Sequence, residues 1–85
     1  MGESIVRQND THSHGGYVME GADTVYANGR PVARIGDKVW CSRHKLQRIA
    51  TGSGSVFAEG EGVARNGDRV SCGAILISDS NVKAG

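Results

Sequence analysis

The chain has 85 residues, of which 38% are apolar, with one Phe, one Trp and two Tyr, so it forms one small domain with a thin core. A formal net charge of +1 makes no strong electrostatic case for nucleic acid or acidic lipid as a partner of the whole chain. No apolar run resembles a signal peptide or is long enough to span a bilayer, so we expect synthesis in the cytosol.

The N-terminal segment begins a pattern that returns twice. Residues 5–10 (IVRQND) correspond to residues 32–37 (VARIGD) further along the chain. His14 lies four residues after the aspartate and is followed by two glycines and the apolar residues 17–19. We predict that a first copy of a repeat covers about residues 5–19.

The second and third copies are clearer. Residues 20–41 and 51–72 are identical at 11 of 22 positions at an offset of 31. Repetition at a fixed period indicates one supersecondary unit that packs against copies of itself. We predict copies at about 20–50 and 51–78 in a single domain over residues 1–85. The shared positions are Gly21/Gly52, Val25/Val56, Ala27/Ala58, Gly29/Gly60, Val32/Val63, Ala33/Ala64, Arg34/Arg65, Gly36/Gly67, Asp37/Asp68, Val39/Val70 and Cys41/Cys72.

Short strands and tight turns are the expected local structure. Thr24–Ala27 and Ser55–Ala58 combine β-branched and aromatic residues, and the dipeptide at 28–29 (Asn-Gly) is a strong turn signal that leads into Val32–Ile35. With 13 glycines and a single proline, the composition favours an all-β fold. The segment 42–48 is predicted to be a loop or one helical turn, and the polar tail 78–85 is expected to fray.

Each copy carries the pattern Arg-x-(Gly or Asn)-Asp, which we interpret as a structural corner. Gly and Asn tolerate positive φ best, and an aspartate in this place is well positioned to accept backbone N–H groups of the turn. The arginines are expected to bond carbonyl or carboxylate oxygens. The arginines are Arg7, Arg34 and Arg65, the turn residues are Asn9, Gly36 and Gly67, and the aspartates are Asp10, Asp37 and Asp68.

The same repeat position, four residues after each aspartate, holds His14, Cys41 or Cys72. An insertion after Cys41 adds His44, which gives four candidate metal ligands. Zinc in structural sites takes four tetrahedral ligands of this kind, and two thiolates with two neutral imidazoles cancel its charge. We therefore predict a structural zinc site, with iron as the other metal that suits this ligand set. A disulfide between the cysteines is not expected in the cytosol.

His12 and Trp40 are open to two interpretations each. His12 lies two residues before His14, so along a strand both side chains would point the same way, and His12 could replace another ligand. The other interpretation is an exposed residue or one that supports the ligands from outside. We prefer His14, because it has the repeat position of the cysteines. Trp40 is interpreted as a partly buried packing residue, and contact with a membrane is the alternative.

The segments GRPVARIGD (29–37), GVARNGD (62–68), SHGG (13–16) and SCGA (71–74) together resemble the PAAR (proline–alanine–alanine–arginine) repeat proteins, over about residues 5–78. Those proteins form the sharp tip of the type VI secretion spike and of related phage-tail devices. The sequence departs from the motif where Val32 replaces alanine, Gly62 stands in the place of proline and Asn9 replaces glycine.

The resemblance implies a small cone of short strands with pseudo-threefold internal repeats and a zinc near its apex. It also implies that the wide base binds, at one copy per trimer, the blunt end of a trimeric β-helical spike protein, the valine–glycine repeat protein G (VgrG). With about ten residues outside the repeats, we expect no fused effector domain. We expect a structural protein, not an enzyme, that sharpens the spike for piercing an envelope and helps to load separate effectors.

The same resemblance implies export on the spike to the extracellular space or a target cell, with transient membrane contact and no stable insertion. Two other function classes compete with this interpretation. The first is a small zinc-binding module for nucleic acid or protein, although ligand separations of 27 and 31 residues are unlike those of a finger. The second is an enzyme, which a closed four-ligand metal shell argues against.

Overall fold

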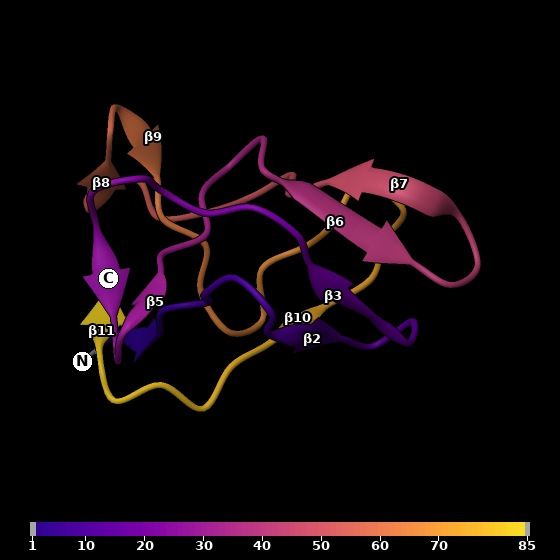
Figure 1. Cartoon of the computed structure of the whole chain (residues 1–85), viewed down its shortest axis with the longest axis horizontal. Coiled ribbons are helices and arrows are strands. Elements are labelled where there is room, and N and C mark those ends of the chain that lie inside the picture. The colour runs from indigo at the N-terminus through magenta and orange to yellow at the C-terminus, as the bar shows by residue number, and fades with distance from the viewer. Residues whose placement is uncertain (1, 85) are drawn as a thin grey trace.

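A computed structural model of the chain describes residues 2–84, and it is all-β, as predicted (Figure 1). Among these residues no helix is long and apolar enough to cross a bilayer. No strand in this part of the chain exceeds four residues, as expected for a glycine-rich repeat with turns at short intervals. The strands are Glu3–Ser4 (β1), Thr11–His12 (β2), Gly16–Val18 (β3), Tyr26–Ala27 (β4), Arg30–Pro31 (β5), Lys38–Cys41 (β6), Lys45–Arg48 (β7), Phe57–Ala58 (β8), Glu61–Gly62 (β9), Leu76–Ile77 (β10) and Lys83–Ala84 (β11).

The three repeat copies meet in a closed ring of backbone hydrogen bonds. The N–H of Ala33 donates to the carbonyl of Val6, that of Ala64 to Ala33, and that of Val6 to Ala64, each at 2.9 Å. All three residues are fully buried. Their small side chains allow three backbones to approach one axis, which explains why the repeat has alanine at this position in two copies. The ring gives the molecule its pseudo-threefold axis.

Each Arg-x-(Gly or Asn)-Asp segment forms the predicted corner. The third residue of the pattern has positive φ in all three copies, at 75° for Asn9, 92° for Gly36 and 94° for Gly67. One oxygen of the aspartate then accepts the backbone N–H of the arginine three residues earlier, at 2.8 Å in every copy. The arginine side chain also bonds that carboxylate, so the corner is closed by backbone and side chain together.

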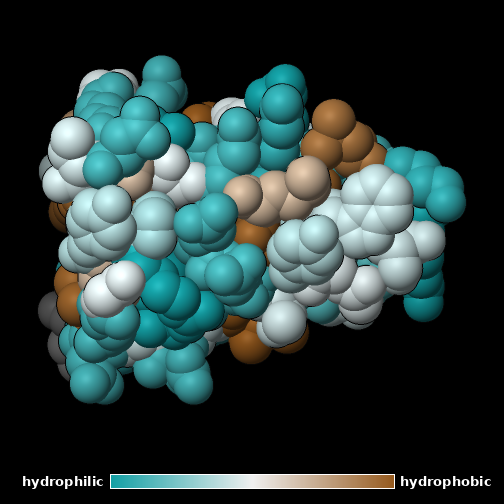
Figure 2. Space-filling view, viewed as in Figure 1, coloured by the Kyte–Doolittle hydropathy of each residue, from teal (hydrophilic) through white to brown (hydrophobic). Residues whose placement is uncertain are grey.

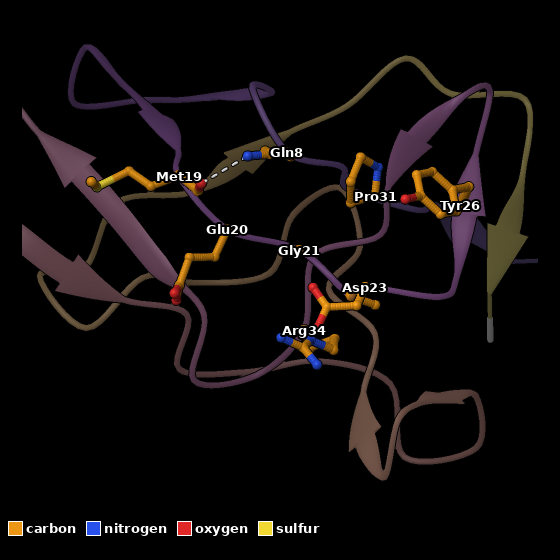
Figure 3. Close-up of a pocket in the computed structure, with 9 residues that line it drawn as sticks. Gln8, Met19, Glu20, Gly21, Asp23, Tyr26, Pro31 and Arg34 are labelled. Atoms are coloured by element: carbon orange, nitrogen blue, oxygen red, sulfur yellow. Dashed lines mark hydrogen bonds between the residues drawn. The ribbon is translucent and has the colours of Figure 1, made fainter.

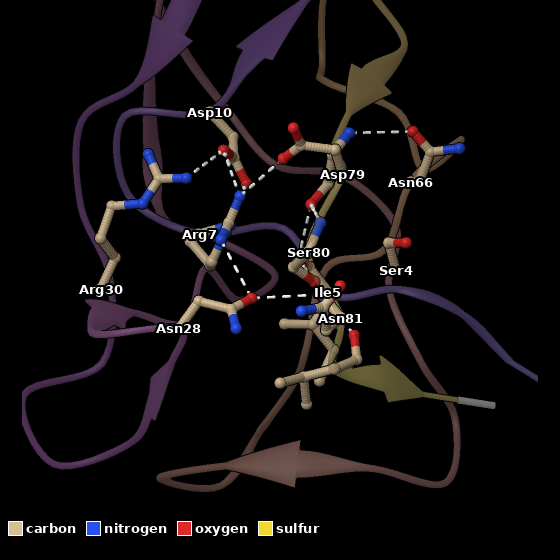
Figure 4. Close-up of polar contacts among 12 residues, drawn as sticks. Ser4, Ile5, Arg7, Asp10, Asn28, Arg30, Asn66, Asp79, Ser80 and Asn81 are labelled. Carbon is tan, nitrogen blue, oxygen red and sulfur yellow. Dashed lines mark hydrogen bonds and ion pairs between the residues drawn. The ribbon is translucent and has the colours of Figure 1, made fainter.

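The corner of the first copy is the most deeply buried one (Figure 4). Arg7 is 5% exposed and bonds Asp10, the Asn28 side chain and Asp79. Arg30 adds a second cation to Asp10, at 2.9 Å. The first corner thus fastens the second copy and the C-terminal segment to the first copy, and its charges are balanced within the network.

Three equivalent two-stranded hairpins lie at one end of the molecule, on the left in Figure 1. Hairpin β4–β5 turns through the predicted Asn-Gly dipeptide, and β8–β9 turns through the equivalent Glu59-Gly60; all four residues have positive φ. The third unit has the same two-stranded pairing but no connecting turn, because it pairs β11 with β1 from the two ends of the chain. We call it the third hairpin for its equivalence to the other two. Its Ala84 is 3% exposed, and the expectation that the tail 78–85 frays was wrong for residues up to 84.

The opposite end is a five-stranded antiparallel sheet in the order β10-β2-β3-β6-β7. Segment 42–48, predicted as a loop or helical turn, instead forms the turn and second strand of hairpin β6–β7. Positive φ at Lys45 (64°) closes this hairpin, and no glycine signals it in the sequence. The turns β2–β3 and β6–β7 point away from both termini (Figure 1).

Two apolar clusters fill the interior, and both consist of repeat-equivalent residues. The basal cluster includes Ile5, Val32 and Val63 beside the three hairpins. The apical cluster packs Val18, Ile49 and Leu76 beneath the five-stranded sheet, and Cys72 lies against it. The apical cluster therefore ends where the candidate metal ligands begin.

Candidate metal centre

The side chains of His14, Cys41, His44 and Cys72 converge at the apical end of the molecule. His14 lies in the β2–β3 turn, Cys41 ends β6, His44 lies in the β6–β7 turn, and Cys72 lies in the turn before Ala74. Gly15 and Gly73 follow the first-copy and third-copy ligands with φ of 75° and 90°. These turns reverse the chain directly after the ligand, so each ligand projects from the tip of its copy.

The distances among the ligand atoms match a tetrahedral site. All four atoms lie within 4.8 Å of one another. The Sγ of Cys41 lies 3.8 Å from the Sγ of Cys72, 3.9 Å from Nδ1 of His14 and 3.5 Å from Nδ1 of His44. A tetrahedron with Zn–S bonds of about 2.3 Å and Zn–N bonds of about 2.0 Å has edges of about 3.3–3.8 Å. The cluster could therefore hold a metal ion.

Neighbouring groups prepare Cys41 to act as a thiolate. Burial raises the pKa of the Cys41 thiol, but the His44 ring, the backbone N–H groups of Arg43 and His44, and the Cys72 thiol all hydrogen-bond its sulfur and together lower the pKa to about 6. Metals bind the thiolate form of cysteine. Both cysteines are free thiols.

His12 lies beside this cluster but faces away from it. Its Nε2 lies 2.7 Å from the carbonyl oxygen of Trp40, and its Nδ1 accepts the backbone N–H of His14 at 3.2 Å. The second bond makes Nδ1 an acceptor, so Nε2 carries the proton and donates to Trp40. Both ring nitrogens are thus engaged with backbone groups of two ligand-bearing segments. His12 is therefore not among the four residues whose ligand atoms converge.

Gly16 makes this contact possible. A Cβ at Gly16 would lie 1.8 Å from the carbonyl oxygen of Trp40 and 2.4 Å from Nε2 of His12. The β3 and β6 backbones could not approach so closely with any side chain in that place.

The sequence matches a known protein family. The family described as "PAAR motif" matches residues 8–78, which is most of the sequence. The chain belongs to the PAAR motif family. Comparison with curated proteins finds no significant match.

The PAAR domain also has an open cleft of about 420 Å³ on its flank (Figure 3). Glu20, Asp23 and Arg34 contribute charged groups to its lining, and Gln8 spans one wall through a 3.0 Å bond to the carbonyl of Met19.

Sequence reasoning missed Ser42 and offered a supporting role for His12 only as one of two interpretations. Ser42 donates its hydroxyl to the carbonyl of His14 at 2.8 Å and so ties the β6–β7 turn to the β2–β3 turn. His12 occupies the repeat position of Val39 and Val70, which are both buried. A polar residue at a position that is apolar in the other two copies was the signal that could have identified it.

Proposed function

We propose that this PAAR domain is the tip of a contractile injection spike of the type VI secretion class. The observation that supports this most directly is the closed ring of three repeat copies within one chain. A single polypeptide with three similar sectors can seat on a threefold-symmetric platform without being a trimer itself. The role is structural and not catalytic.

The base that would contact a trimeric VgrG-like spike is the end that carries the three hairpins. Tyr26 and Phe57 hold equivalent positions in hairpins β4–β5 and β8–β9 and are 58% and 59% exposed. Lys83 holds the corresponding position in the hairpin that joins the two chain ends. Exposed aromatic residues are the typical anchors of protein interfaces. We infer that these side chains face the spike.

At the other end we propose that the His14–Cys41–His44–Cys72 cluster binds structural zinc. Two cysteine sulfurs and two imidazole nitrogens are the donor set that zinc prefers, and the ion would tie three repeat tips and one inserted turn together. A narrow apex has too little volume for an apolar core, and metal-binding free energy would replace it.

Four ligand atoms close the tetrahedron, so an ion held there would have no open position for a substrate. We further propose that the tip is made in the cytoplasm, leaves the cell on the spike, touches target membranes transiently and helps to load separate effectors.

The deciding experiment mixes the purified chain with a trimeric spike protein of the VgrG type and measures the mass of the assembly. We expect one copy of this chain per spike trimer. Three copies per trimer, or no assembly at micromolar concentrations, would contradict the proposal. Metal analysis of the same sample, with one zinc per chain expected, tests the apical site separately.

A further inference from the structure

A continuous row of exposed side chains crosses all five strands of the apical sheet. Strand pairing places Ile77 opposite Thr11, Thr11 opposite Tyr17, Tyr17 opposite Trp40, and Trp40 opposite Leu46. The four large side chains are 37–49% exposed, although neighbouring positions on the inner face are buried. We call these five residues the apical stripe.

The apical stripe belongs to one flank of the cone. The repeat positions that correspond to Trp40 hold Ser13 and Ser71, and strand β7, which carries Leu46, comes from the insertion that only the second copy has. White and brown side chains gather over β3, β6 and β7, and teal ones cover most of the other half of the same face (Figure 2). The threefold fold does not require this surface, so its apolar side chains need a separate explanation.

Basic side chains surround the stripe, and none of them belongs to an ion pair among residues 2–84. Lys38 lies directly opposite Arg48 across β6 and β7, and like charges in this arrangement destabilise a sheet. The Nζ of Lys45 lies 5.9 Å from the centre of the Trp40 ring. Arg43 is exposed in the β6–β7 turn, and Arg69 is exposed opposite Ile75, two residues before Ile77.

Acidic groups near the stripe offset only part of these charges. Asp10 is buried between Arg7 and Arg30, and Asp79 pairs with Arg7. Glu20 accepts the backbone N–H of Lys38 and places one carboxylate beside the five basic side chains. Although the whole-chain charge is +1, this flank is therefore basic. Such a surface is complementary to an anionic partner.

The composition of the surface indicates which anionic partner it fits. Trp and Tyr prefer the headgroup level of a bilayer, and Lys and Arg beside them attract anionic lipids. A stable protein partner would bury about 800 Å² on each side, which four half-exposed side chains do not supply. We propose that the apical stripe and its basic rim bind the headgroup region of an anionic bilayer reversibly. The inference relies on the proposed spike-tip role only for its biological setting.

Trp40 is the single tryptophan of the chain, so its fluorescence reports on the stripe directly. The metal-loaded protein is titrated with vesicles of phosphatidylcholine containing about one third phosphatidylglycerol, and with pure phosphatidylcholine vesicles. We expect a blue shift of the Trp40 emission with the anionic vesicles alone, reversed by high salt. Absence of a shift, or an equal shift with neutral vesicles, would overturn the proposal.

Matched variants test the location of the surface. Lys38→Glu combined with Lys45→Glu is expected to weaken vesicle binding at least about tenfold, and Tyr17→Ser to weaken it several-fold. Lys83→Glu and Tyr26→Ser make the same kinds of change at the base and are expected to leave vesicle binding unaltered. Equal losses at both ends would refute the assignment to the stripe, and so would a Trp40 shift with a short DNA duplex in place of vesicles. Lys38 and Lys45 lie away from the base, so their double variant should still bind the spike protein. Loss of vesicle binding with normal spike binding would test this proposal independently of the spike-tip role.

Discussion

The ring of His12 donates a 2.7 Å hydrogen bond to the carbonyl oxygen of Trp40, the residue directly before the candidate ligand Cys41. The other nitrogen of the same ring accepts the N–H of the candidate ligand His14. One buried side chain therefore fixes the backbone of two candidate ligands that are 27 positions apart in the sequence. Groups that orient metal ligands in this way govern how firmly a metal is held.

His12→Val is expected to keep the fold but to loosen the metal. Valine is the residue of the other two copies at this position, so it suits the core, but it leaves the carbonyl of Trp40 without its donor. We expect metal affinity to fall about 10–100-fold. His12→Gln, whose amide can donate to the same carbonyl, should recover part of the loss. Metal transfer to a colorimetric chelator measures the effect, and equal release from the His12→Val variant and the original chain would refute the orienting role.

The side chain of His44 is exposed, so its replacement tests a ligand without disturbing the core. We expect His44→Ala to lower metal affinity by more than about 100-fold, which is the largest loss expected for His12→Val. The melting temperature of the His44→Ala protein should approach that of the chelator-treated original chain. Arg43→Ala, one residue away and also exposed, is the control and should keep one metal per chain. Unchanged metal content of the His44→Ala protein by mass spectrometry would remove His44 from the ligand set.

The sequence predicted the parts of the fold that repeat and failed where the copies differ. The corners and the convergence of His14 with Cys41 and Cys72 follow from equivalent positions around one axis, so an alignment of the chain with itself predicts them. The hairpin of β7 could not be predicted in this way, because it occurs in one copy and begins at a non-glycine residue with positive φ, Lys45. The short segment 82–84 (VKA) matches 25–27 (VYA) and 56–58 (VFA), but three residues at the chain end are too few to indicate a repeat.

Asp68→Asn is expected to lower stability at neutral pH and to have little effect in acid. Burial raises the pKa of Asp68, but bonds from the side chain of Arg65, from Thr51 and from the backbone of Arg65 outweigh it and lower the pKa below the ordinary value of 3.8. The stabilisation is thus fully present above pH 3.8 and is lost as the pH falls through the lower folded value. We expect about 2 kcal/mol at pH 7.

Urea unfolding of this variant and of the original chain, from pH 7 down to pH 3, measures that difference. Both proteins contain the same metal ligands, so the difference isolates the carboxylate. Glu61→Gln, which changes an exposed carboxylate, should follow the original chain throughout. A difference that stayed constant with pH would show that the lost packing or geometry, and not the charge of Asp68, produced it.

Tyr26→Ser together with Phe57→Ser is expected to weaken spike binding while leaving the domain folded. Both rings are more than half exposed, so their removal costs little internal packing, but central aromatic side chains contribute about 2 kcal/mol or more each at interfaces. Together these losses correspond to a fall in affinity for the spike trimer of roughly 1000-fold. Tyr17→Ser, at the apical end, should bind normally. The reverse pattern would place the spike contact at the wrong end of the cone.

Removal of residues 82–85 is expected to destabilise the whole domain and not only the chain end. Strand β11 supplies half of the third hairpin, its Val82 carbonyl accepts the N–H of Ile5 at 2.8 Å, and the buried Ala84 fills the basal cluster beside Val63. The equivalent bonds in the other copies join Val25 to Val32 and Val56 to Val63. Without β11 the third sector lacks a strand that the first two have, and we expect a loss of at least about 2 kcal/mol from exposed apolar surface and unpaired backbone groups.

Lys83→Ala, which keeps the backbone, is the control for this truncation. Denaturant unfolding with and without a chelator measures the loss, and a truncated chain as stable as the original would show that two complete hairpins suffice to hold the base.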